Sequence, residues 1–73
     1  MPGKNIHVVP AGDGWAIEHE GGGQRQEFKR QEDAIAAGTA KAQQEQVELL
    51  IHGRDGQIRE RNSFGHDPRD IKG

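Results

Sequence analysis

The 73-residue chain contains no cysteine and no tyrosine, and it has only one tryptophan and two phenylalanines. Without cysteine, neither disulfides nor a thiolate metal site can stabilise the fold. No apolar stretch approaches the roughly 18 residues that a membrane-spanning helix needs, and the N-terminus lacks the basic-then-apolar layout of a secretory signal. We therefore expect a cytoplasmic protein with no membrane contact and a small hydrophobic core.

An excess of charge of one sign is also lacking. Ten basic and twelve acidic residues give a net charge of -2, and they are interleaved along the chain. Such a surface has no strong overall field that would attract the phosphate backbone of a nucleic acid. The composition therefore disfavours nucleic-acid binding without excluding it.

Apolar residues make up 30% of the chain, but they are gathered into short runs. This gathering favours a folded domain over a disordered segment. A chain of this length buries only about 60% of its surface on folding, so dimerisation is one way to add stability. In so small a core, Trp15 is expected to be a packing anchor. The runs are Ile6 to Val9, Trp15 to Ile17, Ala34 to Ala37 and Val47 to Ile51.

Five segments have the composition or alternation of β-strands. We expect strands over 6–10 and 15–20, joined by a glycine-rich turn, and a short third strand over 24–28. Two more are expected over 47–52 and 57–63, with an Asp-Gly pair indicating the hairpin turn between them. In the most apolar segment, Val47, Leu49 and Ile51 face one way and Leu50 faces the other.

Residues 31–45 have the periodicity of a helix with small residues on one face. Neither Arg30 nor Gln31 is a favoured N-cap, and Gly38 costs about 1 kcal/mol relative to alanine. The helix should therefore be stable only when docked on a sheet. Its docking face comprises Ala34, Ile35, Gly38, Ala42 and the stem of Lys41.

These elements predict a single α+β domain: an antiparallel sheet of four to five strands with one helix packed on one face, in the order β-β-β-α-β-β. We expect the domain to cover residues 1–65. Residues 66–73 include Pro68 and few apolar groups, and they are expected to form an irregular C-terminal tail.

Several blocks resemble a known family. The blocks are His7-Val8-Val9-Pro10, Gly14-Trp15-Ala16-Ile17, Phe28 with Glu32-Asp33-Ala34-Ile35, and Leu50 to Glu60. Together they resemble the small bacterial family called domain of unknown function 2188, from roughly Ile6 to Pro68. Members often have Thr or Ser at the position of Arg30 and Ala at that of Gly38. The family has no assigned activity, so the resemblance implies the fold and a bacterial cytoplasmic origin but no catalytic residue.

A second similarity concerns the arm-binding domains of phage-type integrases, which have three strands and a helix. The shared features are the Trp15 strand, a glycine turn, and Phe28 followed by a Glu-Ala helix start. Those domains lay the sheet in a DNA groove. By analogy, the alternative function is nucleic-acid binding through the sheet face, with Arg59 and Arg61 on one side of a strand.

No residue pattern predicts catalysis, a cofactor or a metal site. The four histidines, His7, His19, His52 and His66, lack the H-x-x-x-H or H-x-H spacing that places two ligands on one element. We expect solvated or edge histidines. Asp55 suits a tight turn better than a cation site. We therefore expect neither an enzyme nor a metal or cofactor protein.

The remaining hypothesis is a non-catalytic interaction module that binds an unidentified protein partner or a second copy through a sheet edge or face. Leu50 points to the face of the sheet that the helix does not cover, so another chain would have to shield it from solvent. An apolar patch around Leu50 would favour a protein partner or a homodimer. An uninterrupted basic face would favour a nucleic acid. The candidate interaction surface comprises Leu50, His52, Arg54, Arg59 and Arg61.

Overall fold

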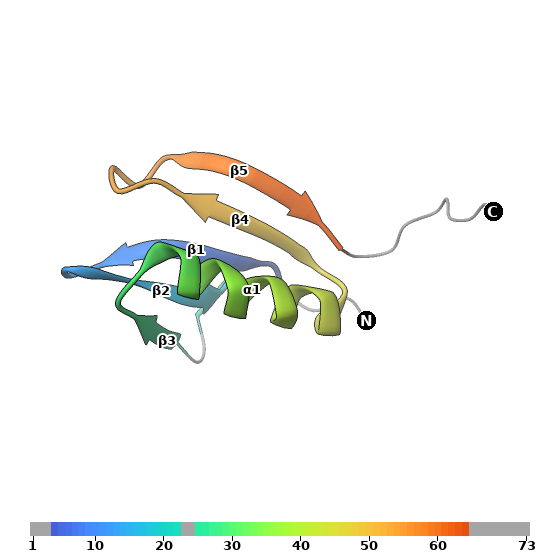
Figure 1. The fold of residues 1–73 in the computed structure, drawn as a ribbon. Coiled ribbons are helices and arrows are strands. Elements are labelled where there is room, and N and C mark those ends of the chain that lie inside the picture. The colour runs from blue at the N-terminus through green and yellow to red at the C-terminus, as the bar shows by residue number, and fades with distance from the viewer. Residues whose placement is uncertain (1–3, 23–24, 65–73) are drawn as a thin grey trace.

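The computed structural model describes residues 4–22 and 25–64 (Figure 1). In chain order, the elements are β1 (Ile6–Ala11), β2 (Gly14–His19), β3 (Arg25–Phe28), α1 (Gln31–Glu45), β4 (Glu48–His52) and β5 (Ile58–Ser63). This order confirms the predicted α+β class. The tail predicted over 66–73 lies outside the described residues. No helix in the described ranges is long and apolar enough to cross a membrane.

The strands form one sheet with the order β3-β2-β1-β4-β5. Three neighbouring pairs are antiparallel, but β1 and β4 are parallel, with Ile6 opposite Leu49 and Val8 opposite Ile51. The sheet is therefore mixed, and the prediction of an antiparallel sheet was wrong in this respect. The cause is α1, which connects β3 to β4 as a crossover. Parallel neighbours need such a connection.

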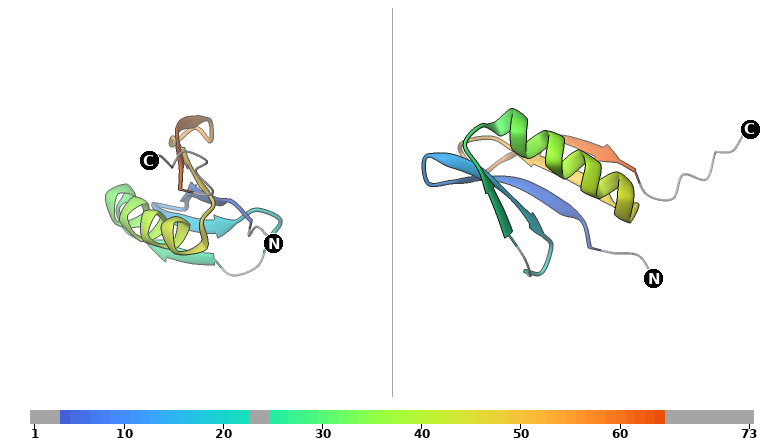
Figure 2. Two further views of the ribbon diagram at one scale, coloured as in Figure 1. Left: turned by 90° about the vertical axis from the view of Figure 1, so that its right-hand side faces the viewer. Right: turned by 60° about the horizontal axis from the view of Figure 1, so that its bottom comes forward.

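The core lies between α1 and one face of the sheet (Figure 2). The sheet contributes large apolar side chains, among them Ile6 and Leu49, which are completely buried. The helix contributes the small residues Ala34, Gly38 and Ala42, as predicted. A Cβ added at Gly38 would lie 2.9 Å from Cδ1 of Leu49, so the absent side chain lets the helix approach the sheet closely.

The two ends of α1 differ: its start lacks a side-chain cap, and its end is closed by a backbone hydrogen bond. Arg30 precedes the helix in an extended conformation and forms no side-chain capping bond. The helix ends at Gln46, which has a left-handed φ of 59°, and the N–H of Val47 donates to the carbonyl of Ala42 at 3.0 Å. With an uncapped start and small residues on its buried face, α1 depends on docking for its stability.

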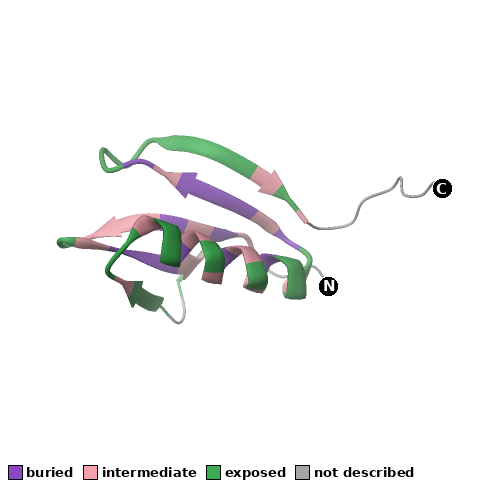
Figure 3. Cartoon of the chain, in the orientation of Figure 1, coloured by how far each residue is buried: buried purple, intermediate pink, exposed green. Residues whose placement is uncertain are grey.

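Burial differs sharply between the two strands of the last hairpin (Figure 3). Three of the five β4 residues are buried, and none of the six β5 residues is. The hairpin rises away from α1, so β5 forms a sheet edge that the helix does not cover (Figures 1 and 2). Trp15 is 8% exposed and belongs to the core, which confirms it as a packing anchor.

Candidate functional site

Leu50 faces away from α1, as the alternation of β4 predicted. It lies opposite His7 of β1 and Arg61 of β5. Its exposed fraction is only 6%, because its neighbours on the open face of the sheet already cover it. Leu50 therefore presents no apolar patch. Among the described residues, the one exposed large hydrophobic side chain is Ile58 of β5, at 49%.

Arg54, in the β4–β5 hairpin, contacts the β1–β2 hairpin. Its guanidinium carbon lies 4.4 Å from the centre of the Trp15 ring, and the group donates to the carbonyls of Gly12 and Gly14 at 3.2 and 3.0 Å. A guanidinium is attracted to the face of an indole, and its planar set of N–H groups can serve several acceptors at once. Arg54 therefore ties the β4–β5 turn to the β1–β2 turn.

Asp55 and Gly56 form the β4–β5 turn, as predicted. Oδ1 of Asp55 accepts a hydrogen bond from the N–H of Gln57 at 3.1 Å, and Oδ2 forms an ion pair with Arg59 at 3.0 Å. Gly56 has a φ of +88°, which a residue with a side chain rarely adopts. Within this turn, the carboxylate orders the backbone.

A β-bulge interrupts the alternation of β5. Glu60 and Ile58 pair with consecutive residues of β4, so Arg59 between them has no partner there. The stem of Arg59 lies against Gly53, where an added Cβ would be 2.7 Å from Nε. Arg61 lies in the regular part of the ladder. The strict alternation that predicted both arginines on one side of the strand therefore does not hold.

Some basic side chains of the sheet form ion pairs with neighbouring carboxylates, and others do not. Arg25 on β3 lies 3.5 Å from Glu18 and 3.9 Å from Glu27. Such exposed pairs contribute little to stability. They do, however, prevent an uninterrupted basic face. Within the described ranges, Arg61 forms no ion pair.

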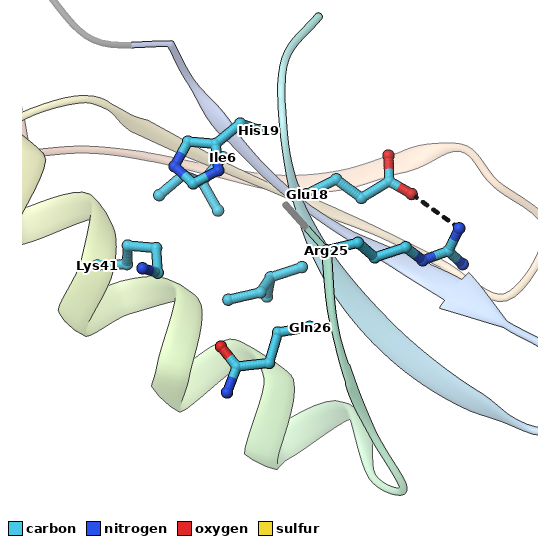
Figure 4. A pocket seen from close by; sticks show the side chains of 7 residues that line it. Ile6, Glu18, His19, Arg25, Gln26 and Lys41 are labelled. Atoms are coloured by element: carbon cyan, nitrogen blue, oxygen red, sulfur yellow. Dashed lines mark ion pairs between the residues drawn. The ribbon is translucent and has the colours of Figure 1, made fainter. Parts of the chain in front are cut away.

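A pocket of about 330 Å³ lies between α1 and the strands β2 and β3 (Figure 4). Ile6 and Ile17 supply its apolar lining, and Lys41 of α1 faces Gln26 of β3 across it. Its other cationic group, Arg25, is held by a carboxylate. A single ammonium group beside an apolar lining does not specify a ligand, and we assign none to this pocket.

The parallel pairing of β1 and β4 brings together two histidines that lie far apart in the sequence. Nδ1 of His7 is 2.9 Å from Nε2 of His52. Nε2 of His7 is 3.4 Å from Glu20, and Nδ1 of His52 is 2.9 Å from the carbonyl of Gly56. The expectation of solvated or edge histidines was wrong for this pair, because both strands lie inside the sheet and the two rings, Glu20 and the Gly56 carbonyl form a hydrogen-bonded network. Sequence spacing gave no signal for it, because the contact depends on the register of non-adjacent strands.

Neither of the other two histidines is seen in contact with this pair. Nε2 of His19 is 3.1 Å from Glu45 at the end of α1, and His66 lies outside the described residues. Within 4–22 and 25–64, no group of three or more histidine, aspartate or glutamate side chains is arranged to hold a metal ion.

Comparison with known protein families shows to which family the chain belongs. A family model described as "Uncharacterized protein conserved in bacteria (DUF2188)" matches residues 6–64. The chain belongs to this family. Neither a curated protein nor a solved structure matches it.

In this DUF2188 chain, residues His52 to Ile58 lie within the Leu50 to Glu60 block on which the resemblance rests. The structure shows what several of its residues contact: Arg54 holds the neighbouring hairpin, Asp55 orders the turn, and Gly56 adopts a positive φ. These contacts explain the block by the requirements of the fold.

Proposed function

We propose that this DUF2188 chain is a non-catalytic interaction module that binds an extended segment of another protein along the free edge of β5. The observation that carries the proposal is the strand order, which leaves β5 with a neighbour on one side only among the described residues. The unpaired N–H and C=O groups of an edge strand are a template for another chain.

The backbone groups at this edge can be identified from the ladder. The N–H of Phe64 donates to the carbonyl of Val47 at 3.2 Å, which makes these residues a hydrogen-bonded pair. Bonding alternates along antiparallel strands. The backbone of Asn62 therefore faces β4, whereas the backbone groups of Arg61 and Ser63 point outward and can pair with an added strand.

The side chains of β5 also suit recognition. Five of its six residues are exposed, and none belongs to the hydrophobic core. Ile58 offers an apolar contact, and Arg61 a cation with no ion pair in the described part of the chain. A partner strand with a carboxylate opposite Arg61 would add an opposite-charge pair across the new ladder.

A second copy fits the edge less well than a different protein. When two identical antiparallel strands pair about a two-fold axis, the residue at the axis lies opposite its own copy. An axis at Arg59, Glu60 or Arg61 would place like charges face to face, which is destabilising, so only an axis at one of the three uncharged residues avoids the repulsion. Among the described residues, the bulge at Arg59 breaks the alternation of Arg59 with Arg61, and an ion pair holds Arg25, so no uninterrupted basic face supports a nucleic-acid partner.

The test is selection of short peptides from a random display library on the purified chain. Ser63→Pro removes an outward N–H without removing a bond to β4, and Ser63→Ala is the matched control. Selected peptides should bind wild type and Ser63→Ala equally and bind Ser63→Pro about 10-fold more weakly, the effect of one lost hydrogen bond. Circular dichroism should show the same fold for all three proteins.

Other outcomes would overturn the proposal. They are failure to select any peptide, or binding that Ser63→Pro leaves unchanged. A dimer in analytical ultracentrifugation that Ser63→Pro dissociates would make a second copy the partner. A gel shift with DNA that weakens steeply with salt would favour the nucleic-acid alternative.

A further inference from the structure

The His7–His52 pair lies on the face of the sheet away from α1, since His7 alternates with the buried residues Ile6 and Val8. The ring centres are 5.1 Å apart, nearly the 2.9 Å between the two nitrogens plus the radii of both rings. The nitrogens therefore point at each other. Lone pairs in this arrangement do not converge on a third point, as metal ligation would require, but they can share a proton.

The acceptors at the two ends of this hydrogen-bonded network, Glu20 and the carbonyl of Gly56, determine where the protons of the histidines lie. The carbonyl of Gly56 can only accept, so Nδ1 of His52 carries a proton. Nε2 of a neutral His52 then accepts from the Nδ1–H of His7. The carboxylate of Glu20 also accepts, and it is served when Nε2 of His7 is protonated as well. All three hydrogen bonds form together when His7 is an imidazolium and His52 is neutral.

Starting from this singly protonated pair, removing one proton and adding one proton have unequal effects on the hydrogen bond between the rings. Loss of the proton on Nε2 of His7 gives up the long 3.4 Å contact with Glu20 and keeps the bond between the rings. A second proton, on Nε2 of His52, would face the N–H of His7 and abolish that bond. Two positive rings would then lie with their nearest nitrogens 2.9 Å apart.

We propose that the His7–His52 pair is a proton-dependent clasp across the parallel seam between β1 and β4. The clasp is closed while the pair holds at most one proton beyond its neutral state, and it opens when acidification adds a second. β1 is the strand that connects the β4–β5 hairpin to the rest of the sheet, so an open clasp loosens the hairpin.

The charged groups around the pair do not replace this bond. On the same face, Glu18 of β2 lies opposite His7 but pairs with Arg25, and Arg61 of β5 lies opposite Leu50. Glu20 follows β2 and contacts His7 directly, and Glu48 lies further along β4. The unfolded chain can take both protons without losing a bond, so acidification should favour unfolding.

Nitrogen-15 NMR of the histidine rings tests the proton arrangement in the full chain. At neutral pH, His52 should be the neutral tautomer with its proton on Nδ1. The pair should take up protons in two coupled steps. In His52→Gln, the coupling partner is absent, and His7 should take up its proton in a single step. Two-step proton uptake by His7 that persists in His52→Gln, or a proton on Nε2 of neutral His52, would overturn the proposal.

Thermal unfolding tests the consequence. Between pH 7 and pH 5, the Tm of wild type should fall by about 5 °C more than that of His52→Gln, a shift within the range expected for a domain of this size when one interaction is lost. His19→Gln, which removes a histidine outside the pair, should retain the full acid sensitivity of wild type. Equal falls in wild type and His52→Gln would contradict the clasp.

Discussion

In β4, Leu49, Leu50 and Ile51 are all buried, whereas β5 has no buried residue, although the two strands form one hairpin. β4 has a strand on each side and α1 over one face. Within residues 4–22 and 25–64, β5 has one neighbouring strand, and it lies beyond the helix (Figure 3). The difference shows that position in the sheet, more than strand propensity, decides how much a strand contributes to the core. β4 contributes to the core, and β5 contributes its exposed edge, where we propose that recognition takes place.

The largest expected effect comes from matched truncations in the two strands. Leu49→Ala should lower the free energy of unfolding by about 2–5 kcal/mol, because it leaves a cavity at a completely buried position. Ile58→Ala, at 49% exposure, should change it by less than about 0.5 kcal/mol. Urea denaturation measures both, and similar losses would abolish the distinction between the strands.

Arg54 joins the β4–β5 turn to the β1–β2 turn, so its removal should loosen the exposed hairpin. We expect Arg54→Ala to cost about 1–2 kcal/mol, because the contacts with Trp15 and the turn carbonyls are lost together. Arg54→Lys keeps the charge but not the planar donor set, and it should recover less than half of the loss. Full recovery by lysine would mean that charge alone matters.

Gly38 tests how tightly α1 packs on the buried side of β4. Alanine favours a helix by about 1 kcal/mol over glycine, but its Cβ would lie 2.9 Å from Leu49 and 3.3 Å from Ile17. Overpacking a core typically costs about 1–3 kcal/mol, so Gly38→Ala should be destabilising by about 1 kcal/mol net. A stabilised variant in thermal unfolding would show that the side chains of β4 can move aside.

The smallest effect is expected at the start of α1, away from both strands of the hairpin. Arg30→Ser supplies the missing cap and should stabilise the protein by about 0.5–1 kcal/mol, since the ion pair lost with Glu32 is exposed. Arg30→Ala is the control that removes the arginine without adding a cap. Equal Tm values for the two variants would show that docking already secures this end.

The elements themselves were largely predictable from local sequence. The helix over 31–45 was predicted with its observed bounds, because its small-residue periodicity is continuous and Gln46 ends it. The hairpin turn at Asp55-Gly56 was predictable because an Asp-Gly pair meets a local backbone requirement. Family membership was also readable from these blocks.

The candidate surface was less predictable, because its properties depend on contacts between distant segments. Arg54 was expected to face a partner, but the neighbouring hairpin occupies it. Leu50 was expected to need cover, but the strands on either side of it supply that cover. The bulge at Arg59 depends on how β5 pairs with β4, which no short-range pattern encodes.

By itself, the sequence determined which segments become helix, strand and turn, since these depend on periodicity and on residues such as Gly56 that permit particular backbone angles. Only the tertiary structure decided that β1 and β4 run parallel, that β5 forms an open edge, and that His7 meets His52. The physical reason is that strand order and register arise from packing between segments more than 40 residues apart.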